Sequence, residues 1–284
     1  MRALDPEVFD SVWAAIEPLI PLVADEHPLG CHRPRSSSRD CFKVMLVRLA
    51  TGCSWEDAER LCGNKVSDTT VRQRRDDWHA AGVFEAIAGE ALSAYDRIIG
   101  LDLGDVAVDG SLHKSPGGGE GTGKNPTDRG KLGWKWSILT DRSGIPLGWV
   151  CDGANRNDSI LLAPTLDTAA RRGLLADIET IWLDRGYDSH VTRQRLAERD
   201  LDDAVIATKR KRGSGAAKLN QPMGLRWPVE RTNSWLSNFG QLRRNTDRKP
   251  AHRLAQLALA VTFLLTAKLI DWRNRWSPDL SPIR

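Results

Sequence analysis

Paired cysteines, a membrane-length apolar run and an export signal are all lacking, and each absence excludes a class of protein. None of the five cysteines stands at Cys-x-x-Cys spacing, so neither a disulfide framework nor a structural zinc site is expected. The opening residues, MRALDPEVFD, carry acids and a proline where a signal peptide needs a continuous apolar stretch. The most apolar stretch, 254–270, contains Gln256, Thr262, Thr266 and Lys268, which favours a buried helix over a membrane span. We therefore expect a soluble cytoplasmic protein without a membrane partner.

The composition is that of a folded globular protein. Of the 284 residues, 40% are hydrophobic and 27% are charged, which is enough apolar material for a sizeable core and too much for a disordered chain. The length fits one large domain with a smaller one, or two medium domains. The net charge of +4 is a small basic excess, so its distribution along the chain is more informative than its sum.

The first 97 residues predict a small all-α domain. An apolar stripe in residues 41–52 indicates a helix that ends at Gly52, and Ser54 is placed to cap a second helix. Gly63 then gives a turn before a third helix that closes at Gly82, a helix-turn-helix pattern. The last helix carries three arginines at the place where a recognition helix faces DNA, namely Arg72, Arg74 and Arg75. An ordinary helical bundle with a basic face is equally compatible with the pattern, and Asp76 and Asp77 count against a purely electrostatic DNA helix.

Residues 98–284 predict an α/β domain that ends in a C-terminal helix. Alternating or short apolar runs predict strands, and longer amphipathic segments predict helices. Strands are expected at 105–111, 132–152 (a hairpin turning at 141–144), 178–184 and 203–209, with helices at 158–172, 188–199 and 226–242. This order predicts a mixed sheet flanked by helices. The Gly-rich segment 115–131 is expected to be a surface loop, since it does not open a helix as a phosphate-binding loop would.

Three acids in the second domain are candidates for chemistry. Asp109 closes the apolar run VAVD and Asp184 closes IWLD, each at the end of a predicted strand, and ligands in open α/β sheets gather at the carboxyl ends of strands. Glu230 lies in a stretch, 209–249, that holds eleven Lys or Arg and two acids. A carboxylate in such a basic field suits a divalent metal beside phosphates. A turn-capping role for each Asp, and a local Arg partner for Glu230, are the structural alternatives.

Taken together, the motifs resemble a known family. DGS (109–111), WLDRGYD (182–188) and RWPVERTNSWL (226–236) occur in order, with LATGCSWED at 49–57, GIPL and GANRNDS within 144–159, and QLRRNTDR at 241–248. With them the sequence resembles a DDE transposase of the IS5/IS4-like insertion-sequence group over most of its length. Met223 and Ser237 stand where related transposases have Tyr and Lys, whereas Arg226 matches their Arg.

The resemblance implies a fold, a site and a reaction. It implies a ribonuclease-H-like catalytic domain in which Asp109, Asp184 and Glu230 hold two Mg²⁺ ions, with Mn²⁺ as a substitute. Two such ions activate a water molecule and stabilise the leaving 3′-oxygen, and hard cations require oxygen ligands. The same site then uses the freed 3′-OH as a nucleophile on target DNA. His113 and His190 lie near the motifs, and neither is needed for this chemistry.

Double-stranded DNA is the partner that the resemblance implies, as transposon ends and as target, with a homodimer in the synaptic complex. Phosphate contacts supply affinity without sequence information. Besides the three arginines of the helical domain, the candidate contacts are Lys209, Arg210, Lys211, Arg212, Arg226, Arg231, Arg243 and Arg244. Two other functions remain open: a helix-turn-helix transcription regulator with a ligand-sensing domain, and a metal-dependent nuclease that does not transfer strands.

Overall fold

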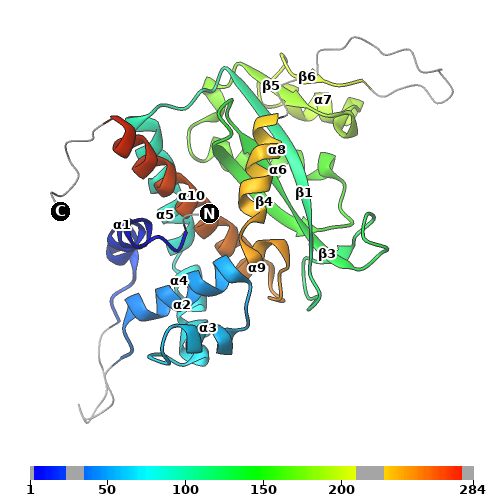
Figure 1. Ribbon diagram of the computed structural model, residues 1–284. Helices are drawn as coiled ribbons and strands as arrows, with labels where there is room; N and C mark the ends of the chain where they lie inside the picture. Colours follow the sequence, from blue (N-terminus) through cyan, green and yellow to red (C-terminus); the bar gives the residue numbers. More distant parts are fainter. Residues whose placement is uncertain (1–2, 24–34, 209–226, 277–284) are drawn as a thin grey trace. The chain divides into compact units, whose positions relative to one another are not determined.

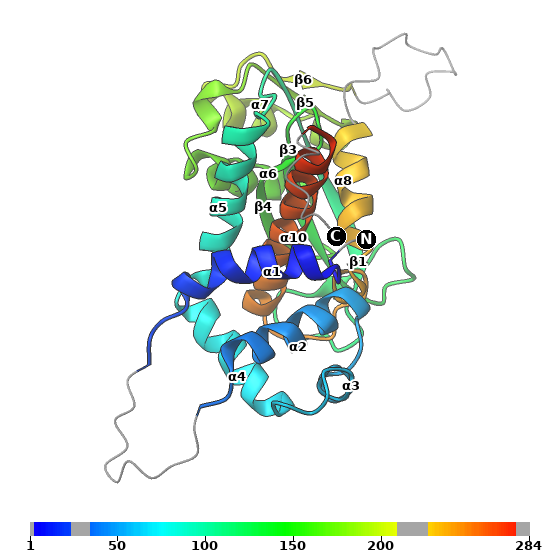
Figure 2. The ribbon, with the colours of Figure 1, turned by 60° about the vertical axis from the view of Figure 1, so that its left-hand side comes forward.

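The computed structural model describes residues 3–23, 35–208 and 227–276. The chain forms two compact units (Figures 1 and 2). Met1–Ile99 and Leu236–Arg284 form one, here called the helical unit, and Gly100–Trp235 forms the other, the sheet unit. The helical unit is therefore built from both ends of the sequence.

The helices of the helical unit begin and end largely where local sequence signals place them. Ser54 caps α3 by accepting a hydrogen bond from Asp57 N, Ser67 caps α4 in the same way through Thr70 N, and Gly52 ends α2 with a φ of 75°. These confirm the predicted helices, including the two joined by the turn at Gly63. The described elements are α1 (Pro6–Ile16), η1 (Glu17–Leu19), α2 (Ser38–Thr51), α3 (Trp55–Leu61), α4 (Asp68–Ala80), α5 (Val83–Ile98), α9 (Gly240–Arg243) and α10 (Pro250–Trp276).

Aromatic residues form the centre of this unit. The buried ring of Phe42 on α2 has the rings of Trp13, Trp78 and Phe263 around it, with centroids 5.7–6.5 Å away. Phe263 belongs to α10, which packs along α5 and also contacts α1 (Figure 2). α10 is long and apolar enough to cross a membrane by length and composition, but 61% of its most apolar window is buried inside the protein, as in a core helix.

This packing divides the chain differently from the sequence-based boundary. The C-terminal helix was expected within the domain 98–284, but residues from Leu236 onward belong to the helical unit. The physical reason is that the apolar face of α5 is covered by α10. α5 itself was not distinguished as a separate helix in the sequence. The helix expected at 226–242 is also two helices, α8 (Trp227–Ser237) and α9, with Phe239 between them.

The sheet unit is built on one mixed sheet. Its strands are β1 (Asp105–Lys114), β2 (Gly123–Lys124), β3 (Leu132–Thr140), β4 (Pro146–Gly153), β5 (Thr180–Leu183) and β6 (Val205–Ile206). β3 pairs antiparallel with both β1 and β4, whereas β5 pairs parallel with β1 and β6 pairs parallel with β5. The helices α6 (Asp158–Ala170) and α7 (His190–Ala197) connect these strands, with short turns η2 (Leu175–Asp177) and η3 (Arg185–Tyr187). A mixed sheet flanked by helices, with a helical N-terminal region, confirms the predicted fold class.

Different helices cover the two faces of the sheet. Residues of β1 and β3 alternate between the faces, so Trp136 and Ser137 point in opposite directions. Ser137 accepts a hydrogen bond from Thr165 of α6, whereas the Trp136 indole donates to Asn233 of α8. Thus α6 packs on one face and α8 on the other, as Figure 1 shows for α8 beside β1.

Candidate active site

Asp109 and Asp184 come from neighbouring parallel strands. β1 and β5 pair from Asp105 opposite Thr180 to Ala107 opposite Trp182, and Asp109 and Asp184 each lie two residues beyond the last pair of this ladder. Asp184 follows the last residue of β5, as predicted. Asp109 does not end its strand, because β1 continues to Lys114 along β3. Asp109 therefore lies within β1, near the end of the neighbouring strand β5.

Asp109 and Asp184 each accept a hydrogen bond from a nearby backbone N–H group. Asp109 Oδ1 accepts a hydrogen bond from Gly110 N at 2.9 Å, and its Oδ2 lies 3.5 Å from Asn233 Nδ2. Asp184 Oδ1 accepts from Gly186 N at 2.7 Å and caps the turn η3. The turn-capping alternative is therefore correct for Asp184, but it uses only one of the two oxygens.

A concentration of negative charge surrounds the end of β5. Tyr187 is buried, and its pKa is raised first by burial and then by the charges of Asp158, Asp109 and Asp184. Asp158 was not singled out in the sequence. It opens α6, pairs with the buried Lys135 at 2.7 Å, and lies so close to Gly110 that a Cβ on that glycine would be 2.2 Å from its Oδ1. Any side chain at position 110 would therefore force the Asp158 carboxylate to move.

Glu230 is placed differently from the two aspartates. It lies exposed in the first turn of α8, the helix whose Asn233 reaches Asp109. Residues three apart on a helix share a face, so α8 brings Glu230 to the side of the sheet on which Asp109 lies. However, no group of three His, Cys, Asp or Glu close enough to hold a metal ion exists among the residues the structure describes. The carboxylates are therefore not gathered into a preformed three-ligand set.

Of the two histidines near the motifs, one has a pKa too low for proton transfer at neutral pH, and the other lies at the surface. His113 on β1 is stacked on Trp136 at 3.6 Å between ring centroids, and burial lowers its pKa to about 3. His190 is exposed at the start of α7. The Trp182 indole donates to Asp105 Oδ1 at 2.7 Å, whereas Trp227 is 56% exposed.

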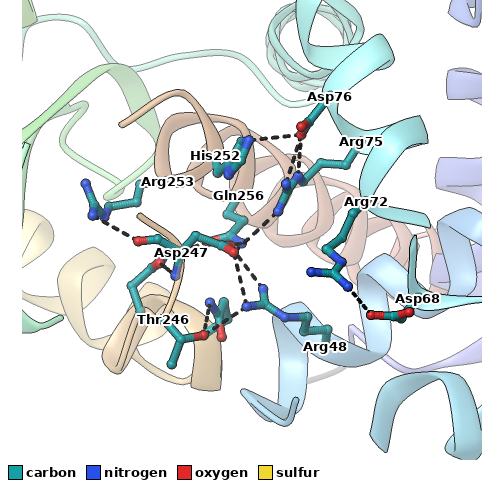
Figure 3. Close-up of polar contacts among 12 residues, drawn as sticks. Arg48, Asp68, Arg72, Arg75, Asp76, Thr246, Asp247, His252, Arg253 and Gln256 are labelled. Carbon is teal, nitrogen blue, oxygen red and sulfur yellow. Dashed lines mark hydrogen bonds and ion pairs between the residues drawn. The ribbon is translucent and has the colours of Figure 1, made fainter. Parts of the chain in front are cut away.

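Two of the three arginines predicted on the recognition helix are internal. Arg74 and Arg75 of α4 are each 6% exposed. Arg74 donates to the Ser36 carbonyl oxygen, and Arg75 pairs with Asp76 and with the buried Asp247 (Figure 3). Helical periodicity placed all three arginines on one basic helix without showing which side faces the core. Only Arg72 is exposed, and it pairs with Asp68 one turn earlier.

The arginines of the C-terminal stretch also differ in accessibility. Arg243 and Arg244 are exposed. Arg231 donates to the Ser143 carbonyl oxygen, and its guanidinium lies 4.3 and 4.7 Å from the ring centroids of Trp227 and Trp235. Lys209, Arg210, Lys211, Arg212 and Arg226 lie outside the described residues.

Comparison with known proteins gives two family matches. Residues 101–265, more than half of the chain, match the family described as "Transposase DDE domain", and residues 8–88 match "Putative transposase of IS4/5 family". The first match runs over both units and includes all three candidate acids. The strand order and the mixed pairing of the sheet agree with a ribonuclease-H-like fold.

Two curated relatives come from an insertion element of Burkholderia cepacia. The "Putative transposase for insertion sequence element IS402" is 39% identical over 133 residues, 45% of this chain and 60% of the relative. The "Insertion element IS402 uncharacterized 16.2 kDa protein" is 32% identical over 123 residues, 43% of this chain and 82% of the relative. The chain thus spans about 60% of the first relative's length.

A solved structure, the "Mos1 transposase paired-end complex with left transposon end", covers 87% of this chain and 82% of its own. Its sequence identity is 11% and its TM-score is 0.26, a similarity too low to support any conclusion. The family match over residues 101–265 is independent of it. The chain belongs to the transposase DDE domain family.

Proposed function

We propose that the protein is the transposase of an insertion sequence. It binds the terminal inverted repeats of its element, cleaves the DNA at the element ends and transfers the 3′-OH ends to target DNA. The observation that supports this most is the parallel pairing of β1 with β5, because Asp109 and Asp184 each lie two residues beyond the last pair of that ladder in a chain of the DDE family.

The donor set fits hard divalent cations. Asp109, Asp184 and Glu230 offer only carboxylate oxygens, the ligands that Mg²⁺ and Mn²⁺ prefer. Mg²⁺ is commonly bound by one or two carboxylates together with substrate phosphates, so the lack of a preformed three-ligand group in the described residues is compatible with loading on DNA. We propose two ions per site. When bound, they supply an activated water or 3′-OH and stabilise the leaving oxygen.

The described residues have distinct roles in this proposal. Asp109 and Asp184 hold the cations, and α8 presents Glu230 as the third ligand from the other side of the site. Arg243 and Arg244 bind phosphates because their charges are exposed, and Arg72 is the α4 arginine that remains accessible to DNA. Double-stranded DNA, a homodimer in the synaptic complex and a cytoplasmic location complete the proposal.

The proposed function is tested by the metal dependence of DNA cleavage and by substitution of the three acids. Purified protein is incubated with a duplex that carries the element end, in Mg²⁺, in Mn²⁺ and in EDTA. We expect the wild type to cleave in either metal. The variants should cleave no more in metal than the wild type does in EDTA, namely Asp109→Asn, Asp184→Asn and Glu230→Gln. Asn at position 184 still accepts the hydrogen bond from Gly186 N, so the fold is preserved. Asp202→Asn, at an exposed acid, is the matched control and retains activity.

Strand transfer separates the proposal from the other two functions. With pre-cleaved ends and a supercoiled target, a transposase joins the 3′-OH ends to the target, whereas a nuclease of the same fold leaves them unjoined. A transcription regulator binds the end sequence but cleaves nothing and needs none of the acids. Wild-type cleavage in EDTA would contradict the metal mechanism.

A further inference from the structure

Asn233 connects α8, the helix that carries Glu230, to Asp109. It lies one turn after Glu230 on α8 and is 8% exposed. Its Oδ1 accepts a hydrogen bond from the Trp136 indole at 2.7 Å, and its Nδ2 lies 3.5 Å from Asp109 Oδ2. The second contact is longer than an ordinary N–H···O hydrogen bond, as catalytic hydrogen bonds often are before ligands are in place.

Trp136 fixes which way the Asn233 amide points. An indole nitrogen is a donor only, so the amide oxygen must face Trp136. The amide NH₂ group must then face the carboxylate of Asp109, where it acts as a donor. The donor-only indole therefore determines the orientation of the amide.

The indole is itself held rigidly. Trp136 is fully buried, and its strand places it opposite Ser111, on the same face of the sheet as Asp109. The ring of His113 stacks on it at 3.6 Å between centroids. Burial lowers the pKa of His113 to about 3, so this support is uncharged at neutral pH.

The two oxygens of Asp109 therefore face different donors. Gly110 N donates to Oδ1 and Asn233 Nδ2 approaches Oδ2. Both donors are neutral, so they orient the carboxylate without neutralising its charge.

Docking of α8 on the sheet does not require this amide. The Thr232 hydroxyl already joins the helix to the Gly144 carbonyl oxygen at the β3–β4 turn. Thr232 is buried like Asn233 and is adjacent to it in sequence. It is therefore a matched residue that anchors α8 but has no hydrogen bond to Asp109.

We propose that Asn233 is a positioning residue that orients the Asp109 carboxylate for divalent cation binding, and that Trp136 fixes its amide for this task. The inference rests on the proposed function, because Asp109 is a metal ligand only in that proposal.

Metal binding without DNA tests this role. Mn²⁺ is titrated into wild-type protein, Asn233→Leu, Trp136→Phe, Thr232→Val and Asp109→Asn, with bound Mn²⁺ followed by electron paramagnetic resonance and unfolding followed on the same samples. Leu keeps the branching pattern of the Asn233 side chain without its hydrogen bonds, and Phe keeps a ring at 136 without the donor. We expect Asn233→Leu and Trp136→Phe to weaken Mn²⁺ binding by about 10- to 100-fold, the range for groups that orient metal ligands. The double variant should be no weaker than Asn233→Leu alone, because both changes break one chain of contacts.

Thr232→Val separates positioning from docking. It should lower the unfolding temperature but leave the Mn²⁺ affinity unchanged. Wild-type affinity in folded Asn233→Leu, or equal weakening in Thr232→Val, would overturn the inference. If Asn233→Leu does not fold, unchanged affinity in Trp136→Phe overturns it instead.

Asp109→Asn distinguishes the two levels of the proposal. If it loses Mn²⁺ binding while Asn233→Leu does not, only the role of Asn233 fails. If wild type and Asp109→Asn bind Mn²⁺ equally, the metal site of the proposed function fails as well.

Discussion

Asp247 in the helical unit and Asp141 in the sheet unit are both buried aspartates, yet their environments shift the pKa in opposite directions. Asp247 is 8% exposed, and burial alone would raise its pKa. Arg48 and Arg75 contact its carboxylate at 3.1 and 3.3 Å, and with the Gln256 amide they lower the pKa below the ordinary value (Figure 3).

Asp141 has backbone donors instead of cations. It is 1% exposed at the β3–β4 turn and accepts hydrogen bonds from Ile145 N at 2.7 Å and Asp102 N at 3.3 Å. Burial raises its pKa to about 6 in spite of these bonds. In this protein, guanidinium groups around the buried Asp247 favour its ionised form even in acid. The backbone amides around Asp141 do not offset the effect of burial on its pKa.

The largest expected effect is at Asp247. Asp247→Asn leaves the charges of Arg48 and Arg75 buried without their carboxylate, so the free energy of unfolding should fall by about 3–5 kcal/mol at pH 7. Urea denaturation followed by tryptophan fluorescence measures it. The control is Asp10→Asn in the same unit, whose pair with Arg39 is exposed on both sides and should cost no more than about 1 kcal/mol. Equal losses in the two variants would contradict the comparison.

Asp141 is expected to have a smaller effect on the free energy of unfolding, and this effect depends on pH in the direction opposite to that of an aspartate with a lowered pKa. Because its folded pKa of about 6 exceeds the unfolded value of 3.8, the folded state binds the proton more tightly. Its contribution to stability is therefore present below pH 4 and is lost as the pH rises to about 6, by about 2–3 kcal/mol. From pH 4 to 7, the free energy of unfolding of the wild type should fall by this amount relative to that of Asp141→Asn. Parallel pH profiles would show that Asp141 is not protonated in the folded state.

The smallest effect concerns cations that are exposed rather than paired in the interior. Arg243→Ala with Arg244→Ala should flatten the log–log salt dependence of DNA binding by up to about two units, with similar loss on any duplex sequence. Stability should change little because both side chains are exposed. The salt slope and the unfolding temperature are measured on one preparation. An unchanged slope with a lowered unfolding temperature would mean that these arginines have internal partners, as Arg75 has.

Local signals in the sequence predicted much of the fold. Gly52, Ser54 and Ser67 mark helix ends because a left-handed φ or a side-chain cap is a property of one short segment. The hairpin of β3 and β4 and the strand that ends at Asp184 follow from apolar runs and turn residues. The partner of α10 could not be predicted, because a helix with buried residues all round does not indicate which unit it joins.

The candidate site was predictable in its acids but not in its supporting contacts. Asp109 and Asp184 close predicted apolar runs, and each lies two residues beyond the last pair of the parallel ladder between β1 and β5. Asp158 and Asn233 have no such signal, because their partners Lys135, Trp136 and Asp109 are distant in sequence. Arg74 and Arg75 were expected to be exposed because charged residues usually are, and burial beside Asp247 or a backbone carbonyl depends on tertiary packing.

The assembly of the helical unit from both chain ends has a consequence for synthesis on the ribosome. The first part of this unit is made early, and residues 100–235 must be translated before its second part begins. At about 5–20 residues per second this interval is on the order of 10 s. At the end of this interval the sheet unit has its entire sequence, whereas α5 still has no α10 to cover its apolar face. A translation product that stops before residue 236 would thus carry Asp109, Asp184 and Glu230 with a helical unit that is unable to complete its core.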